Sequence, residues 1–350
     1  MAGVSYGTCH AVPPDPMGAS PAWENAAASQ MITLIVPTRN RCHTLAIVGA
    51  SFYQLRLVSE IIFVLDAATD GSSEYLAQLA ADHPCKKTLI VQNEHRIGAA
   101  GCRMRGVSTA TNELVLFCDD DLFLEPGYDE VCLRKLHETG AGAVSGRHLF
   151  RLPGEAPNTA IARFGNGSRR TAPFNRLLCE VVPEAYYEGD IEIPLTNACI
   201  LTKKSLLQRY GFDPFYRSGN GYREESDFQM NMFVNNYSIR VTNEAHAVHL
   251  HRSEVRTGGN RVNRIARIYW AVYYTSYFYR KYWNRYAGRV GLRCPRTVAL
   301  LIFAVWVAYA TLLRPLRHMV PATGPSLSPR SPPAHGRRGD SQQRKEAPRI

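Results

Sequence analysis

Four short apolar runs alternate with helix-forming segments in the first third of the chain, and this alternation limits the possible folds more than any other feature. Each run consists mainly of β-branched and other apolar residues, although the third also has polar residues at its ends, and such runs are typical of strands buried on both faces. The runs comprise residues 32–36, 61–65, 87–93 and 114–117. Strands that alternate with helices pair in parallel, and the sequence therefore predicts a doubly wound α/β sheet.

Polar side chains follow each of these strands. They are Thr38, Arg39 and Asn40 after the first strand, Asp66 after the second, Asn93 after the third, and Asp119, Asp120 and Asp121 after the fourth. Ligands of doubly wound sheets bind beyond the carboxyl ends of the strands, where these side chains would meet. A single polar residue there is most simply a cap or a turn residue, but the four groups together favour a binding site.

The three consecutive carboxylates of Asp119, Asp120 and Asp121 need a compensating charge. Adjacent carboxylates repel one another and lose solvation near a core, so the arrangement is unfavourable without a cation or a set of donors. Mg²⁺ and Mn²⁺ bind to proteins through one or two carboxylates together with substrate phosphates. The trio therefore predicts a divalent metal site, and an acidic turn at the surface is the alternative.

A second acidic cluster, Glu224, Glu225 and Asp227, follows the glycine-rich segment GNGYR at the start of a predicted helix. Carboxylates in the first turn of a helix are stabilised by the helix dipole, which is one explanation of the cluster. The other is that one carboxylate acts as a general base, a role that requires proximity to the proton it removes. The residues alone leave both explanations open.

Several classes of protein are excluded by patterns that the sequence lacks. The nine cysteines include no CxxC pair, which argues against a zinc cluster or a disulfide framework and favours a reducing compartment. There is no Gly-x-x-x-x-Gly-Lys-Ser/Thr phosphate loop. No secretion signal opens the chain, so we do not expect export by that route.

Five motifs, LIVPTRNR, FVLDAATDGS, NEHRIGAAGCRMRGV, FCDDDL and YREESDF, follow one another in this order between residues 31 and 251. Together they resemble the family 2 glycosyltransferases of the GT-A fold, inverting enzymes that use nucleotide-sugar donors. The resemblance implies a Rossmann-like, mixed and mainly parallel sheet flanked by helices. A helical extension would follow it at the C-terminal end.

The resemblance also implies roles for individual residues. The donor nucleotide would contact Thr38, Arg39, Asp66, Arg103, Asp119 and Asp120. Met104 stands where the family often has Asn, so the pattern departs at that position. The metal ligands would be Asp121, Asp119 and His249, with His251 as a runner-up for His249.

The catalytic base would be Glu225, with Glu224 as the alternative. These residues would transfer a sugar from a nucleotide-diphospho-sugar to a hydroxyl acceptor in a single displacement that depends on Mn²⁺ or Mg²⁺. The acceptor could be a polysaccharide, a lipid-linked sugar or a small molecule. The alternatives are a nucleotidyltransferase-like enzyme and a catalytically inactive nucleotide-sugar-binding protein.

The C-terminal part of the chain is strongly basic. Residues 252–350 contain 19 basic and 3 acidic side chains, whereas residues 1–251 contain 22 basic and 27 acidic side chains. This distribution favours contact with a membrane surface on its cytoplasmic side, and no nucleic-acid-binding module accompanies the charge. Residues 297–313 are uncharged, and 17 helical residues extend only about 25 Å, which is borderline for a span.

These observations predict the organisation of the whole chain. The predicted segments are a disordered region at 1–30, the glycosyltransferase domain at 31–251, a basic aromatic helical extension at 252–296, a hydrophobic helix at 297–313 and a disordered basic tail at 314–350. The extension carries nine aromatic residues between Tyr269 and Trp283. A helix packed on the catalytic domain and a helix seated among lipid headgroups are both compatible with this pattern.

Overall fold

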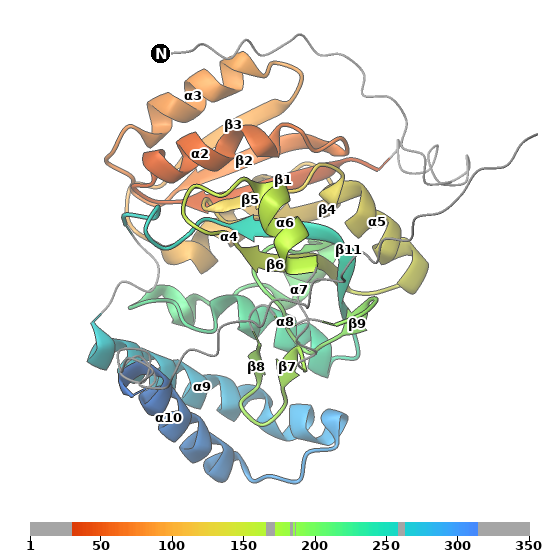
Figure 1. The fold of residues 1–350 in the computed structure, drawn as a ribbon, viewed down its shortest axis with the longest axis vertical. Helices are drawn as coiled ribbons and strands as arrows, with labels where there is room; N and C mark the ends of the chain where they lie inside the picture. Colours follow the sequence, from red (N-terminus) through yellow and green to blue (C-terminus); the bar gives the residue numbers. More distant parts are fainter. Residues whose placement is uncertain (1–29, 166–171, 183–184, 186, 258–262, 314–350) are drawn as a thin grey trace, which may run out of the picture.

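The protein is described by a computed structural model that covers residues 30–165, 172–182, 185, 187–257 and 263–313 (Figure 1). The predictions of disorder for residues 1–30 and 314–350 fall outside these ranges, apart from residue 30.

A nine-stranded sheet forms the centre of the molecule, in the order β3-β2-β1-β4-β10-β6-β11-β5, with β9 also paired to β11. The bounds of its strands are β1 Ile32–Thr38, β2 Val58–Leu65, β3 Lys87–Gln92, β4 Leu114–Phe117, β5 Leu122–Leu124, β6 Ala143–Phe150, β9 Ile191–Glu192, β10 Leu201–Lys203 and β11 Ile239–His249. A separate hairpin pairs β7, Phe174–Asn175, with β8, Glu180–Val181.

The pairing is parallel from β3 to β4 and again between β6 and β11. The short strand β10 lies between the two parallel parts and is antiparallel to both of its neighbours. The mixed, mainly parallel sheet expected from the resemblance is therefore confirmed. The purely parallel pairing suggested by the alternation of elements holds only for β3, β2, β1 and β4.

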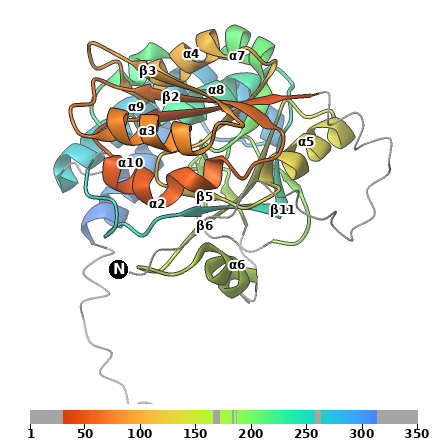
Figure 2. The same ribbon diagram turned by 90° about the horizontal axis from the view of Figure 1, so that it is seen from above.

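Helices cover both faces of the sheet (Figure 2). Their bounds are α2 Cys42–Phe52, α3 Ser72–Asp82, α4 Gly98–Thr109, α5 Tyr128–Thr139, α6 Pro157–Gly165, α7 Lys204–Tyr210, α8 Glu224–Val234, α9 Arg264–Val290 and α10 Arg296–Leu312, with a 3-10 turn at Pro214–Arg217. In β1, Leu34 packs on the α2, α3 and α5 side, whereas Ile35 packs on the side of α4, α7, α8 and α9. This two-sided burial explains the continuous apolar runs of the strands.

Close packing fixes α4 against β1, and this contact positions one wall of the site. A Cβ atom placed on Gly106 of α4 would lie 2.4 Å from Cγ2 of Ile35. Any larger residue at this position would push the helix away from the sheet.

The aromatic helix α9 packs on the preceding part of the chain, which agrees with the first of the two interpretations of its sequence. Tyr274 and Tyr279 are buried, and their hydroxyls donate hydrogen bonds to the backbone oxygens of Ser218 and Leu178. Buried tyrosine hydroxyls need such partners, and here loops earlier in the chain provide them.

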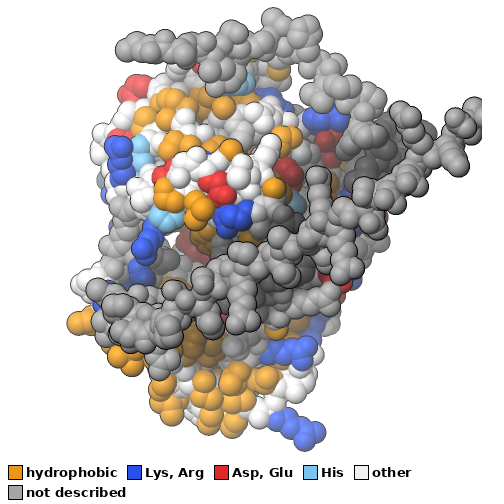
Figure 3. Space-filling view, viewed as in Figure 1, with side chains coloured by type: hydrophobic (Ala, Val, Ile, Leu, Met, Phe, Trp, Pro, Cys, Tyr) orange, Lys and Arg blue, Asp and Glu red, His pale blue; other side chains and the backbone are white. Residues whose placement is uncertain are grey.

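The last described helix, α10, packs antiparallel on α9 and presents apolar side chains on its outer side (Figure 3). Within the residues that the structure describes, no helix combines the length and the apolar character needed to cross a membrane.

Candidate active site

The acidic trio lies at the carboxyl edge of the sheet and faces inward. Asp120 and Asp121 are 4% and 7% exposed, and Asp119 is partly buried. Thr38, the last residue of β1, donates a hydrogen bond from its hydroxyl to Oδ2 of Asp120 at 2.7 Å. The structure thus brings Thr38 and all three carboxylates together, because β1 and β4 are adjacent parallel strands.

Two arginines offset part of the negative charge of the trio. Nη1 of Arg41 lies 2.5 Å from Oδ1 of Asp120 and 2.8 Å from Oδ2 of Asp121. Arg103 on α4 is 3% exposed, and its Nη2 lies 2.7 Å from Oδ1 of Asp119. The chain itself therefore compensates part of the buried negative charge. Of the two arginines, only Arg103 was among the predicted site residues, and Arg41 was not.

The neighbouring charges shift the acidities of the trio in opposite directions. Burial works against ionisation of Asp119, but Arg103 and then His249 hold the pKa of its carboxyl below the usual range. Burial and the adjacent Asp121 carboxylate raise the pKa of Asp120 to about 7 in spite of Arg41. The trio therefore does not carry three equivalent charges near neutral pH.

Arg103 also connects the trio to the second acidic cluster. Its Nη1 lies 2.5 Å from Oε1 of Glu224, the first residue of α8. Oε2 of Glu224 accepts a hydrogen bond from the backbone N–H of Ala100 at 3.0 Å. Both oxygens of Glu224 thus bind groups on α4, which fixes the start of α8 against that helix.

Glu225, by contrast, is partly exposed, and no side chain among the described residues donates a hydrogen bond to it. Burial, and secondly the nearby Glu224 carboxylate, raise the pKa of Glu225 to about 7. A carboxyl group with this pKa can both take up and release a proton near neutral pH.

Backbone strain accumulates around the site. The non-glycine residues Asn40, Ala67 and Arg223 have φ values of 52°, 50° and 78°. Arg223 directly precedes α8, and its buried guanidinium donates hydrogen bonds to the backbone oxygens of Leu178 and Cys179. Strained residues of this kind persist where surrounding contacts hold them, and they concentrate at functional sites.

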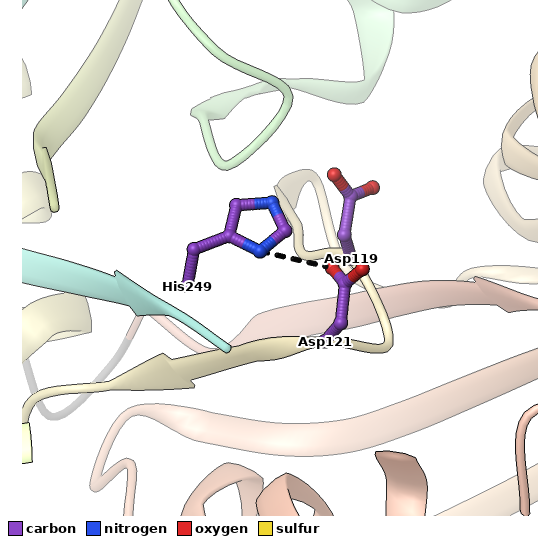
Figure 4. Close-up of side chains that lie close together, drawn as sticks. All are labelled: Asp119, Asp121 and His249. Carbon is purple, nitrogen blue, oxygen red and sulfur yellow. Dashed lines mark ion pairs between the residues drawn. The ribbon is translucent and has the colours of Figure 1, made fainter. Parts of the chain in front are cut away.

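The residues that could hold a metal are Asp119, Asp121 and His249, each offering one ligand atom within 4.8 Å of the others (Figure 4). His249 ends β11, and its Nδ1 lies 3.5 Å from Oδ1 of Asp121. Phe150 stacks on the imidazole with ring centroids 5.2 Å apart. His251, the runner-up, lies beyond the strand, where its Nδ1 contacts the hydroxyl of Ser253.

This donor set fits a divalent cation, since two carboxylates and an imidazole are common ligands of Mn²⁺ and are accepted by Mg²⁺. Each aspartate uses one oxygen for its arginine, Asp119 for Arg103 and Asp121 for Arg41. The other oxygen of each carboxylate is left to face a cation.

Of the predicted nucleotide contacts, Asp66 is buried at the edge of the sheet, whereas Arg39 is exposed. The carboxylate of Asp66 is buried and accepts hydrogen bonds from the backbone N–H groups of Ile97 and Gly98, so it fixes the turn before α4. Gly98 has a φ of +78°, and a Cβ there would lie 3.2 Å from the backbone of Arg217. Arg39 is exposed, and the structure does not bring it to the other predicted residues.

Two of the remaining polar residues are structural. The carboxylate of Asp227 is 1% exposed and accepts hydrogen bonds from Tyr216, Lys281 and Tyr282. It joins α8 to α9, in keeping with the structural explanation of the acidic cluster for this member. Asn93 at the end of β3 accepts a hydrogen bond from Arg105 of α4.

The described fold is similar to solved GT-A glycosyltransferases. S. aureus TarS residues 1–349, in complex with UDP-GlcNAc, has a TM-score of 0.53 and 14% identity, covering 80% of this chain and 73% of that chain. A mannosyltransferase from Pyrobaculum calidifontis, in complex with GDP-Man and Mn²⁺, has a TM-score of 0.50 and 18% identity, and the match covers 83% of this chain and 72% of that chain.

Residues 33–186 match the family model described as Glycosyl transferase family 2. This match covers less than half of the chain and shows that residues 33–186 are similar to family 2 glycosyltransferases. A relative from Mycobacterium tuberculosis (strain CDC 1551 / Oshkosh), whose description places it among glycosyltransferases, is 36% identical over 149 residues. The matched region is 43% of this chain and 40% of that relative, so this chain spans less than half of the relative's length.

Proposed function

We propose that the protein transfers a sugar from a nucleotide-diphospho-sugar to a hydroxyl acceptor, with inversion at the anomeric carbon and with Mn²⁺ or Mg²⁺ as cofactor. The main support for this proposal is that one guanidinium group joins the two groups of carboxylates. Asp119 and Glu224 bind the same guanidinium of Arg103, with Glu225 next in the chain. A cation-binding group and a candidate base thus line one site.

The donor nucleotide would bind along the carboxyl edge of the sheet. Our assignment for its contacts is Thr38, Arg39, Asp66, Arg103, Asp119 and Asp120. The buried guanidinium of Arg103 would favour the diphosphate electrostatically, although two carboxylates already offset its charge.

The cation would be held by Asp121, Asp119 and His249. When bound, Mn²⁺ or Mg²⁺ would offset the negative charge that the departing diphosphate acquires. Arg41 shares Asp121 with this position, and its guanidinium would orient the carboxylate.

Glu225 is our assignment for the general base. A hydroxyl oxygen is a poor nucleophile until its proton is removed, and a carboxylate with a pKa of about 7 suits this task. Glu224 uses both oxygens for α4, which favours Glu225. Attack from the side opposite the diphosphate would invert the anomeric carbon without a covalent enzyme intermediate.

We also propose that the protein works at the cytoplasmic face of a membrane and contacts it through the C-terminal region. The excess of basic residues after position 251 supports this location.

The experiment that tests the transfer reaction measures release of nucleoside diphosphate from UDP-sugars and GDP-sugars in the presence of Mn²⁺. Mass spectrometry of a mixed acceptor pool would identify the product. Wild type should turn over at least one donor, and Glu225→Gln should retain donor binding with turnover reduced by about 10²–10⁴-fold.

The matched control is Glu224→Gln, which removes one charge from the neighbouring position. Loss of turnover in Glu224→Gln with full activity in Glu225→Gln would move the base to Glu224. Donor binding by the wild type without any turnover would instead support the inactive nucleotide-sugar-binding protein.

A further inference from the structure

We propose that the outer side of α10, together with the first turns of α9, forms a surface that docks on a bilayer containing anionic lipids. We call this surface the hairpin face and define it by Ile265, Tyr269, Leu301, Val305 and Leu312. The inference deepens the membrane contact proposed above. It does not depend on sugar transfer.

The hairpin face is apolar and exposed. One side of α10 packs inward through Phe303 and Val307, whereas Leu301 and Val305 on the opposite side are 66% and 63% exposed. Of the fourteen exposed large hydrophobic residues in the described part of the chain, four lie before residue 153 and ten lie between residues 265 and 313. Such a concentration indicates an interaction site, because isolated apolar side chains would be scattered.

The two helices contribute to one continuous surface. The first turns of α9 and the last turn of α10 meet at a shallow apolar groove lined by Asn263, Arg264, Ile265, Ala266, Tyr269 and Leu312. Figure 3 shows the apolar side chains gathered over α10 at the lower end of the molecule, with basic side chains beside them.

The shape and chemistry of the face fit the surface of a bilayer. No described helix can cross a membrane, and α10 has only 17 residues. A helix lying in the interfacial plane buries one apolar side in the lipid without spanning it. Trp306 and Tyr309, which are 36% and 37% exposed, are the residue types that favour the headgroup region.

The charges around the hairpin face favour anionic lipid, rather than a second copy of the chain, as its binding partner. Arg264, Arg293 and Arg296 are exposed and pair with no carboxylate of the described residues. A symmetric dimer through this face would bring these like charges together, which disfavours it. The segment 314–350 contains eight basic and two acidic residues and is therefore also positively charged. The same repulsion disfavours this segment as the partner that covers the hairpin face.

The inner side of α10 connects the hairpin face to the candidate active site. The ring of Phe303 lies 6.2 Å from the ring of Tyr222, and the guanidinium of Arg223 lies 5.4 Å from the Phe303 centroid. Tyr222 and Arg223 directly precede α8, which carries Glu224 and Glu225. A bilayer under the hairpin face would therefore lie at a fixed position relative to the candidate base.

Flotation of the full chain with vesicles tests this inference. Wild type should float with vesicles of phosphatidylcholine and phosphatidylglycerol and should bind vesicles of pure phosphatidylcholine at least tenfold more weakly. Because Leu301 and Val305 are exposed, Leu301→Glu/Val305→Glu should fold normally and lose at least tenfold in binding. The matched control is Leu152→Glu, which changes a residue with 54% exposure elsewhere and should float like wild type.

Binding of UDP and GDP in the presence of Mn²⁺, measured on the same samples, separates this inference from the proposed function. Equal flotation of wild type and Leu301→Glu/Val305→Glu would overturn the hairpin face whether or not nucleotide binds. Absence of wild-type flotation would also overturn it, as would a solution dimer that the double substitution dissociates. Lost nucleotide binding with normal flotation would count against the proposed function alone.

Discussion

At the scale of single residues, the site is organised by two arginines that hold a trio of carboxylates. Arg103 could be named from its motif, but Arg41 could not. The positive φ of Asn40 turns the chain after β1 so that Arg41 faces Asp120 and Asp121, while Arg39 is exposed. Arg39 and Arg41 lie on either side of Asn40 in PTRNR, and the pattern of residue types does not show which of them faces the site.

The pH dependence of turnover should report the ionisation of Glu225. The pKa of this carboxyl is raised to about 7, and only the carboxylate form can remove a proton. The rate should therefore rise about tenfold per pH unit below pH 7 and level off above it. A pH–rate profile of the wild type measures this, and a flat profile between pH 5 and 8 would contradict the assignment of Glu225.

Substitution of Arg41 should make the protein depend more strongly on a cation. Arg41→Met leaves the buried Asp120 and Asp121 without their guanidinium, which should cost about 3 kcal/mol of stability in metal-free solution. Mn²⁺ should then raise the melting temperature more for the variant than for the wild type, because it replaces part of the lost charge. Thermal unfolding with and without Mn²⁺ checks this. An equal shift in both proteins would show that the cation does not bind beside Asp121.

At the scale of elements, the strands marked by apolar runs could be predicted, whereas the direction in which every strand pairs could not. The apolar runs that became β1, β2, β3 and β4 were identified because burial on both faces leaves a clear pattern. The three-residue strand β5 is too short for any periodicity. The antiparallel direction of β10, which interrupts the parallel pairing in the middle of the sheet, has no signal in its residues. The buried side of α9 depends on partners from loops distant in sequence, such as Ser218 and Leu178.

The junction between α8 and α9 should depend on the ion pair of Lys281 with Asp227. Lys281→Met would leave the Asp227 carboxylate buried with hydroxyl donors only, and we expect a loss of about 3 kcal/mol. The control Tyr277→Phe removes one hydrogen bond to the partly buried Asp213 and should cost about 1 kcal/mol. Urea unfolding of both variants measures the difference. A loss below that of Tyr277→Phe would show that the pair does not hold α8 in place.

At the scale of the whole molecule, the protein combines a sheet-centred part, whose residues 33–186 match the family 2 glycosyltransferase model, with two C-terminal helices that differ in what they bury. α9 completes the core under α8, and α10 covers part of α9 while exposing an apolar side. The sequence showed that this region is basic and aromatic. It did not show which aromatic rings face inward, because the tyrosines of α9 occur on both its buried and its exposed sides.

The central claim is that the acidic trio forms a site for a cation shared with the diphosphate of the donor. Isothermal titration of the wild type with UDP and GDP, in the presence and absence of Mn²⁺, tests it most directly. Asp121→Ala is the test variant, and Asp82→Ala, at an exposed position on α3, is the control.

At least one of the nucleotides should bind the wild type and Asp82→Ala at least tenfold more tightly when Mn²⁺ is present, and Asp121→Ala should lose this gain. Binding that does not respond to Mn²⁺, or that is unchanged in Asp121→Ala, would argue against a cation site at the acidic trio.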